Sequence, residues 1–348
     1  MDLSNFDFNL PQGLIASRPL NPRSSSKLLY YKQSAIKDLR FSDLPDILSY
    51  NDLLIFNNTK VIPALLYGYV IKSENENLNN KKIEFLLVNH LARNDWFCIC
   101  KPLKKAKAGC KIFFSNKLFA YVLKKEKKGA ILRFEFTGNF YENLIKTGLM
   151  PIPPYIRKIR EVDQLDKKDY QSIFSKKLGS IASPTASLHF DGKLINKLKE
   201  RGIKFCFVTL HVGIGTFNPI RSKNIFDHEM HTEYGEINKD AAIIINKTLK
   251  TGGRIIPVGT TCLRILESVV LKKNKINPFS GYTNIFITPG YEFKIASGLI
   301  TNFHLPRSSL FILVSSFVGL ETAKKIYSHA IEKKYRFFSY GDGSILLK

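Results

Sequence analysis

The sequence lacks both the cysteine pattern of a disulfide-bonded protein and any hydrophobic run long enough to cross a bilayer. Five cysteines in 348 residues are an odd and sparse set, which argues against a disulfide framework. Cys98 and Cys100 are separated by a single residue, whereas zinc pairs and redox pairs are spaced more widely. The most apolar run, 310–318, is too short to span a membrane, and the first residues do not resemble a signal peptide. We therefore expect a soluble protein of the reducing cytoplasm.

Acidic residues are scarce relative to basic ones. The chain has 53 Lys and Arg against 29 Asp and Glu, a formal net charge of +24. A field of that sign raises the local concentration of polyanions such as nucleic acid. Because the basic residues are scattered and form no tail, a genomic bias toward lysine, asparagine and isoleucine is an alternative explanation of the charge.

Helical periodicity is missing from the segment 64–150. Six short β-patterned segments follow one another there, separated by Gly, Asn and Lys turns, which is typical of a small antiparallel barrel or sandwich. These segments are 66–71, 83–89, 95–101, 111–114, 118–123 and 130–136.

The rest of the chain alternates strands with helices, which indicates α/β layers. Expected strands are 52–56, 205–210, 254–258 and 284–287, and expected helices are 42–47, 194–201, 238–251 and 261–272. Prolines in 151–156 predict a stiff, extended connector. We predict an α/β fold in which a mixed α/β main domain, residues 1–63 and 151–348, is interrupted by an inserted antiparallel β-barrel domain, residues 64–150.

Four of the seven histidines fall within the segment 184–233, together with several carboxylates. Titratable groups at loop positions are costly to bury, so this density indicates a working cleft. His228 and His231, three apart on a predicted helix near Glu229 and Glu233, could bind a metal, although their spacing is not that of the zinc proteases. Hydrogen-bonded core histidines, or metal-free acid–base histidines, are the alternatives.

Two other segments offer polar groups beside predicted helix starts. Thr260 and Thr261 open a predicted helix, whose unpaired amides and partial positive charge suit a carboxylate or phosphate, unless the threonines serve only as a cap. Asn302 and His304 precede Pro306, which is predicted to start a helix that runs to about residue 317.

Two pairs of residues follow predicted strands. Asn57 and Asn58 either form a turn with their own backbone or face a cleft. Gly213 and Gly215 would let a ligand approach the backbone closely. Near the C-terminus, the aromatic residues of 335–342 could stack on nucleobases or form a core strand.

Together these motifs resemble the S-adenosylmethionine:tRNA ribosyltransferase-isomerases of queuosine biosynthesis. The resemblance covers essentially the whole chain in order and is weakest in the β insertion, where mainly 83–87 matches. The matching segments are 6–11, 23–28, 56–63, 151–156, 184–190, 208–217, 227–233, 259–267, 301–306 and 335–342. Ser187 replaces a frequent glycine of the family pattern, and Cys262 stands where serine is common.

The resemblance implies a specific reaction. The family transfers the ribosyl part of S-adenosylmethionine to 7-aminomethyl-7-deazaguanine at the wobble position of tRNA and isomerises it, giving epoxyqueuosine and releasing adenine and methionine. S-adenosylmethionine is then a consumed substrate, and we expect no cofactor, no metal, no membrane partner and a monomer. The implied fold is an α/β domain interrupted by a small β-barrel.

The resemblance also implies roles for the candidate residues. A general base must take a proton from the 5′ carbon beside the sulfonium, and the sequence does not choose among the histidines. The candidate catalytic residues are His189, His211, His228 and His231. The candidate substrate-binding residues are Asn57, Asn58, Thr185, Gly213, Gly215, Asp227, Glu233, Thr260, Thr261, Arg264, Asn302, His304, Arg336, Tyr340 and Asp342. His304 is also a possible base, Thr260 and Thr261 suit the methionine carboxylate, and Asp227, Glu233 or Asp342 could hold an ammonium or a ribose hydroxyl.

Two other classes of function remain open from the sequence. A metal-dependent hydrolase would use the His228 and His231 pair. A non-catalytic RNA-binding protein would bind RNA with a steep salt dependence and would not respond to S-adenosylmethionine.

Overall fold

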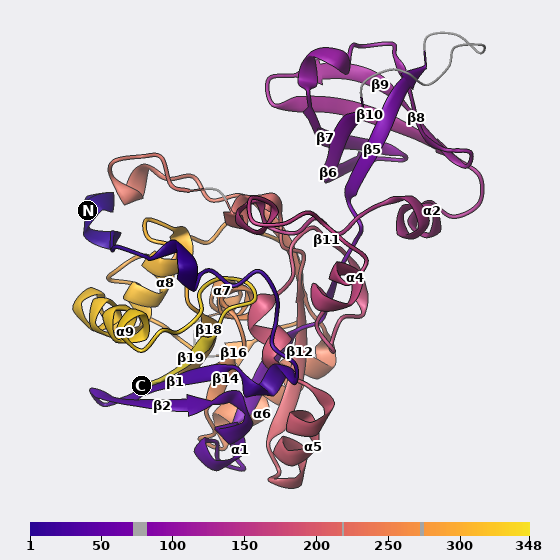
Figure 1. The fold of residues 1–348 in the computed structure, drawn as a ribbon. Helices are drawn as coiled ribbons and strands as arrows, with labels where there is room; N and C mark the ends of the chain where they lie inside the picture. Colours follow the sequence, from indigo (N-terminus) through magenta and orange to yellow (C-terminus); the bar gives the residue numbers. More distant parts are fainter. Residues whose placement is uncertain (72–81, 218, 272–274) are drawn as a thin grey trace. The chain divides into compact units, whose positions relative to one another are not determined.

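The computed structural model describes residues 1–71, 82–217, 219–271 and 275–348 (Figure 1). The chain divides into two compact units. The first comprises Met1–Lys60, Pro153–Arg160 and Gln171–Lys348, and the second comprises Val61–Ile152 and Glu161–Tyr170. The predicted fold class is confirmed, because the first unit has mixed sheets with helices and the second contains a closed antiparallel barrel.

A five-stranded sheet forms the centre of the first unit. Its order is β14 (Ile255–Pro257), β3 (Leu53–Asn57), β12 (Lys204–Leu210), β13 (Glu233–Ile237) and β17 (Phe279–Thr283). The first three strands are parallel and β13 and β17 are antiparallel to their neighbours. Every residue of β3 is buried, because helices cover both faces, as is usual for parallel strands.

Alternate residues of β3 point into two different cores. Leu54 and Phe56 pack in one cluster with α5 (Gly192–Glu200), while Leu53 and Ile55 pack in another with α6 (Lys239–Lys250) and α7 (Thr260–Ser268). This period of two is the geometry of a pleated strand. The helices follow from apolar residues at helical spacing, and side chains of Asp191 and Asn238 cap the starts of α5 and α6.

A second, four-stranded sheet brings the two ends of the chain together. Its order is β18 (Gly298–Asn302), β19 (Gly343–Leu347), β1 (Lys27–Lys32) and β2 (Ala35–Arg40). One core cluster joins Leu29 and Leu346 of this sheet to α8 (Ser309–Val318) and α9 (Leu320–Glu332). The sheet therefore fixes the loops that follow β18 and precede β19.

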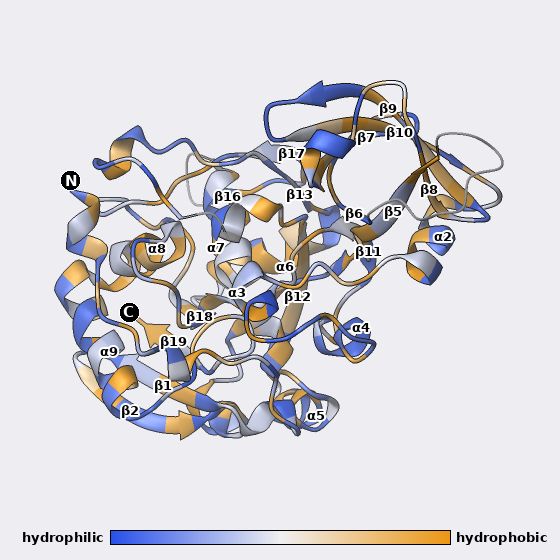
Figure 2. Cartoon of the chain, turned by 45° about the horizontal axis from the view of Figure 1, so that its top comes forward, coloured by the Kyte–Doolittle hydropathy of each residue, from blue (hydrophilic) through white to orange (hydrophobic). Residues whose placement is uncertain are grey.

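The second unit is built around a six-stranded closed barrel, β10-β7-β6-β5-β8-β9. Its strands are β5 (Leu65–Ile71), β6 (Ile83–Ala92), β7 (Asp95–Lys101), β8 (Lys111–Ser115), β9 (Leu118–Glu126) and β10 (Gly129–Phe136), and α2 (Phe140–Thr147) follows them. Alternate residues of β7, including Cys98 and Cys100, fill the interior, and Figure 2 shows hydrophobic and hydrophilic segments alternating along the strands. Burial raises the pKa of Cys98, as expected for an apolar core residue.

The remaining elements are short. They are α1 (Leu44–Ile47), α3 (Pro154–Arg157), α4 (Asp166–Asp169), β4 (Thr59–Val61), β11 (Lys177–Ser180), β15 (Val270–Leu271) and β16 (Lys275–Ile276). None of the helices in the described part of the chain is long and apolar enough to cross a membrane.

Five local predictions were wrong. Residues 284–287 form no strand, and the strand lies just before them as β17. Pro306 does not begin α8, which starts at Ser309 after the Ser308 cap. Pro154 begins the helical turn α3, so the connector is not extended throughout. The segment with His228 and His231 is irregular and not helical. The helix predicted over 261–272 ends at Ser268 as α7 and is followed by the strand β15, while residue 272 lies outside the described residues.

Candidate active site

A pocket in the first unit brings together five of the fifteen predicted substrate-binding residues, namely Thr185, Thr260, Thr261, Asn302 and His304. Its cavity volume is about 80 Å³, and its mouth is open to solvent. Hydroxyl groups dominate its polar lining, and no carboxylate is among the described lining residues. The lining consists of Tyr155, Ser183, Pro184, Thr185, Ala186, Val212, Thr216, Gly259, Thr260, Thr261, Thr301, Asn302, Phe303, His304, Leu305, Ser308, Leu310, Phe338 and Ser339.

The N-terminus of α7 forms one wall of this pocket. Gly259, immediately before the helix, has φ of 99°, a conformation that glycine adopts without the strain of a side chain. Thr260 and Thr261 follow it, and Asn57 donates a hydrogen bond from Nδ2 to Thr261 Oγ1 at 3.3 Å. Asn57 also bonds both backbone groups of Leu210, so this buried amide fixes β3, β12 and α7 together. The helix start therefore presents amides and hydroxyls in a fixed position, suited to an anion.

His304 is the only histidine among the residues that line the pocket in the described chain. Its Nε2 lies 3.3 Å from Thr301 Oγ1, and its Nδ1 lies 3.2 Å from the Tyr327 hydroxyl. Tyr327 also accepts the backbone N–H of His304 at 3.1 Å. Burial lowers the pKa of His304 to about 3, so the ring is neutral at neutral pH.

His189 lies behind the pocket wall and contacts Asn302. The Asn302 amide donates to His189 Nε2 at 3.2 Å and to the Phe338 carbonyl at 3.1 Å, while its Oδ1 accepts from Thr185 at 3.2 Å. The His189 ring stacks on Phe41 at a centroid distance of 3.9 Å. Burial and the nearby arginine charges lower the pKa of His189 to about 3. The neutral ring thus accepts from Asn302 and holds its amide in one orientation.

Two serines near the pocket have hydroxyls without a partner among the described residues. Ser183 lines the pocket. Ser187, in the motif 184–190 that follows it, is fully buried. A buried hydroxyl without a bond is costly, which makes Ser183 available to a ligand. Across the pocket, the Tyr155 hydroxyl bonds to Ser339 and its ring packs on Phe338 at 4.6 Å.

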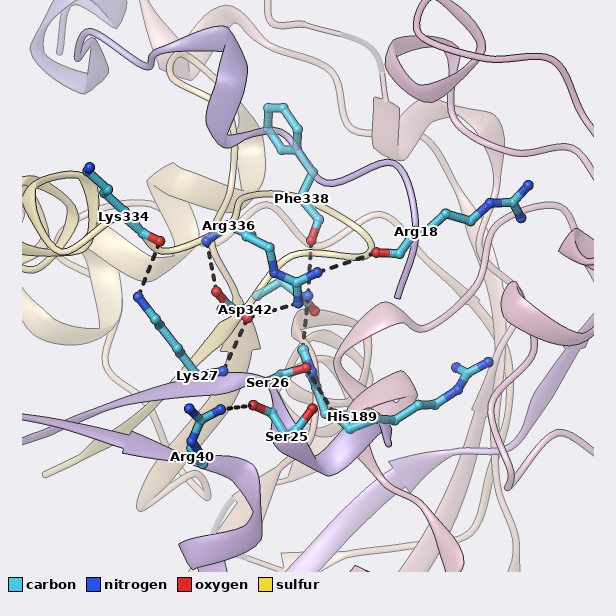
Figure 3. Close-up of polar contacts among 12 residues, drawn as sticks. Arg18, Ser25, Ser26, Lys27, Arg40, His189, Lys334, Arg336, Phe338 and Asp342 are labelled. Carbon is cyan, nitrogen blue, oxygen red and sulfur yellow. Dashed lines mark hydrogen bonds and ion pairs between the residues drawn. The ribbon is translucent and has the colours of Figure 1, made fainter. Parts of the chain in front are cut away.

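Asp342 is occupied by contacts within the protein. It accepts the backbone N–H of Arg336 at 2.8 Å, the Arg336 guanidinium at 3.0 Å and the backbone N–H of Lys27 at 3.1 Å (Figure 3). Arg336 also donates to the Arg18 carbonyl at 3.4 Å. These contacts tie the turn between α9 and β19 to β1.

The predicted stacking surface at 335–342 is not exposed. Tyr335 and Tyr340 are 1% and 2% exposed, so their ring faces are not open to a base. Phe338 is the aromatic residue of this segment that reaches the pocket. The aromatic pattern here therefore reflects core packing, the alternative that the sequence left open, although the segment is a turn and not a strand.

A buried ion pair contacts the first residue of the loop that starts at Gly213. Glu233 bonds to Arg264 from α7, and its Oε1 accepts the N–H of Gly213 at 2.9 Å. Both side chains are at most 5% exposed. Arg264 Nε donates to the Ile285 carbonyl at 3.2 Å, while its Nη2 has no partner among the described residues. The pair links α7 and β13 to the loop that brings Val212 and Thr216 to the pocket.

The other predicted site residues lie apart from the pocket lining. Asn58 accepts from Thr209 at 2.7 Å, and Asp227 is exposed. His231 packs against Gly215, where an added Cβ would lie 1.9 Å from the ring, so the glycine accommodates a side chain and not a ligand. The predicted site residues outside the lining are His189, His211, His228, His231, Asn57, Asn58, Gly213, Gly215, Asp227, Glu233, Arg264, Arg336, Tyr340 and Asp342.

The four histidines of the segment 184–233 do not converge. His189 contacts Asn302, His211 contacts Thr59, His228 packs on Phe286 and His231 packs on Gly215. Within the described ranges, no three His, Cys, Asp or Glu side chains are grouped so that they could hold a metal ion.

Several lining residues were not among the predicted site residues. Tyr155 lies in the proline-rich connector, where the sequence pattern signals only chain stiffness. Ser183, Thr216, Thr301, Ser308 and Ser339 lie within or beside the motifs but carry common hydroxyl side chains. The sequence pointed to these hydroxyl residues only through their neighbours in the motifs, Pro184, Asn302 and Phe338.

The two buried histidines predict a loss of stability in mild acid. Their pKa of about 3 in the folded chain lies below the unfolded value of about 6.5, so protonation favours unfolding. Their contribution is complete above about pH 6.5 and decreases as the pH falls toward 3. Between pH 7 and pH 5 we expect the free energy of unfolding to fall by about 2 kcal/mol for each histidine. Urea unfolding at both pH values measures this, and a His189→Asn, His304→Gln double variant should lack that part of the loss.

Comparison with known proteins covers the whole chain. The profile of the queuosine biosynthesis protein family matches residues 3–346. A protein of Ruegeria pomeroyi is 48% identical over 100% of this chain and 99% of its own length, and one of Thermoanaerobacter is 46% identical over the full length of both. Both are named S-adenosylmethionine:tRNA ribosyltransferase-isomerase.

A solved structure of similar fold extends this comparison. The S-adenosylmethionine tRNA ribosyltransferase of Thermotoga maritima is 32% identical, covers 99% of this chain and 100% of its own, and gives a TM-score of 0.56. The resemblance found in the sequence is thus confirmed, and the chain belongs to the queuosine biosynthesis protein family.

Proposed function

We propose that this protein is an S-adenosylmethionine:tRNA ribosyltransferase-isomerase. It transfers the ribosyl group of S-adenosylmethionine to 7-aminomethyl-7-deazaguanine at the wobble position of tRNA and isomerises it to epoxyqueuosine, with release of adenine and methionine. The observation that carries the proposal is the full-length similarity to relatives of that name. The positive charge of +24 suits a tRNA partner.

The pocket is chemically suited to S-adenosylmethionine. The start of α7 at Thr260 would receive the methionine carboxylate, because helix N-termini stabilise anions. Ser183 and Thr185 offer hydroxyls to the ribose, and Asn302 is held in a single orientation by His189. These contacts would place the sulfonium and its 5′ carbon within the pocket.

His304 is the general base of the proposed mechanism. The sulfonium acidifies the adjacent 5′ C–H, and His304 is the one histidine among the described lining residues, with a neutral ring whose free nitrogen can accept a proton. Its Nδ1 faces Tyr327 and its Nε2 faces the pocket wall at Thr301. When Nδ1 carries the ring proton, the Nε2 lone pair faces the Thr301 hydroxyl, which must turn away before Nε2 can take the 5′ proton.

The proposed reaction uses no resident cofactor or metal, because S-adenosylmethionine itself supplies the ribosyl group and the leaving groups. We place the enzyme in the cytoplasm, where tRNA is modified, and propose that it acts as a monomer. Turnover should accordingly be unchanged by EDTA.

The decisive experiment mixes the purified protein, S-adenosylmethionine and an anticodon stem-loop that carries 7-aminomethyl-7-deazaguanine. We expect adenine release and a matching mass gain on the RNA. An RNA that lacks the aminomethyl group is the control and should give neither. RNA binding without adenine would instead support a binding protein, and activity abolished by EDTA would support a metal-dependent enzyme.

A further inference from the structure

Three side-chain rings lie in a row across three neighbouring strands of the central sheet. His211 directly follows β12, Tyr234 lies on β13 and Tyr282 lies on β17. Tyr234 and Tyr282 are directly paired in the β13–β17 ladder, and the His211 N–H donates to the Tyr234 carbonyl at 2.9 Å. Ring centroids are separated by 5.9 Å between His211 and Tyr234 and by 5.6 Å between Tyr234 and Tyr282. We refer to these three residues as the ring row.

Tyr282, at one end of the ring row, is exposed to solvent, whereas Tyr234 and His211 are held by hydrogen bonds. Tyr282 is 73% exposed, an unusual amount for so large an aromatic side chain. The Tyr234 hydroxyl bonds to Ser280 at 2.7 Å, and His211 Nδ1 bonds to Thr59 Oγ1 at 2.7 Å. Fixed rings of this kind lose little conformational entropy when a flat ligand stacks on them.

The ring row adjoins the pocket lining along the chain, and a lysine–glutamate pair lies near it. Val212, the residue after His211, lines the pocket. Thr59, the partner of His211, is followed by Lys60, and the Thr59 hydroxyl lies 3.5 Å from the Lys177 carbonyl. The nearby carboxylate, Glu236, is paired with the Lys177 ammonium at 2.6 Å. The Lys177 ammonium near His211 is thus already paired, and the rings themselves would make the contact with RNA.

We propose that the ring row stacks unpaired nucleotides of the RNA substrate that flank the base entering the pocket. The inference rests on the proposed function for the identity of that RNA. Aromatic side chains on adjacent strands are a general platform for single-stranded RNA, because successive bases can stack on successive rings. The same surface would discriminate an open anticodon loop from a paired stem, whose bases are stacked on each other.

The test measures binding of a fluorescent anticodon stem-loop to the full-length protein. Tyr282→Ala should weaken binding about tenfold, whereas Tyr282→Phe, which keeps the ring, should bind within about twofold of the wild type. The affinity for S-adenosylmethionine alone and the midpoint of thermal unfolding should be unchanged in both variants.

A second arm replaces the loop nucleotides beside the target base, one at a time, with abasic residues. An abasic residue at the stacked position should lower the RNA affinity of the wild type about tenfold. The same abasic residue should hardly change the affinity of Tyr282→Ala, because that variant has already lost the stacking contact. Equal losses in wild type and Tyr282→Ala at every position would overturn the proposal. A dimer of the free protein that dissociates in Tyr282→Ala would also overturn it, since the row would then be a contact between copies.

Failure of this inference differs from failure of the proposed function. Adenine release by a wild type whose RNA affinity does not depend on Tyr282 would leave the function standing and refute the stacking surface. Tyr282-dependent RNA binding without adenine release would support the stacking surface and refute the reaction.

Discussion

Replacing His304 with alanine should lower kcat/KM for adenine release by about 10³-fold, within the range expected for loss of a general base. The affinity for the stem-loop RNA should remain unchanged, because the histidine contacts the pocket and not the ring row. Single-turnover assays under saturating S-adenosylmethionine separate the chemical step from binding.

Two controls distinguish a base from a merely structural histidine. Added imidazole should restore part of the activity of His304→Ala, because a small base can enter the vacated space. Tyr327→Phe removes the oxygen that faces Nδ1 and should lower turnover about tenfold, through the loss of tautomer control. Full activity of His304→Ala would show that another group takes the proton.

Replacing Glu233 with alanine should lower the free energy of unfolding by about 3–5 kcal/mol. The change leaves the Arg264 guanidinium buried without its counter-charge and removes the acceptor of the Gly213 N–H. Because the same contact holds the loop that carries Thr216, we expect S-adenosylmethionine to bind more weakly as well. Urea unfolding and calorimetric binding measure the two effects.

Glu236 provides the matched control, because it lies on the same strand and forms an exposed pair with Lys177. Glu236→Ala should cost no more than about 1 kcal/mol, as is usual for surface ion pairs. If Glu233→Ala and Glu236→Ala lowered the free energy of unfolding by similar amounts, the buried pair would contribute no more to stability than the surface pair. A Glu233→Met, Arg264→Met double variant should recover part of the stability, since it leaves no unpaired charge.

The barrel strands were predictable because their pattern is local. The segment 95–101 alternates inward and outward side chains, and the structure has β7 at Asp95–Lys101. The prediction failed at 284–287, where an apolar run packs against the core without strand pairing. Apolar residues in such a run signal burial, but they do not by themselves specify a ladder partner.

The sequence identified individual residues of the site, but it did not predict which of them lie together in the structure. Thr185, Thr260 and His304 meet in the pocket, and the motifs identified all three. His189 and His211 look equivalent in sequence, yet one orients Asn302 and the other bonds to Thr59. Which histidine reaches the pocket depends on how the two sheets place their loops, and no spacing along the chain encodes that placement.

The position of β19 between β18 and β1 has a consequence for biosynthesis. Residues 343–347 pair with residues 28–32, so almost the entire polypeptide separates the two partners. The four-stranded sheet cannot be completed until residues 343–347 have emerged from the ribosome, and loop closure over such a distance is slow. The barrel strands are contiguous between residues 65 and 136 and can pair while translation continues. Until then, the apolar residues of β1 and α8 that share a core with β19 lack part of that core, and exposed apolar surface of this kind makes an incomplete chain prone to aggregation.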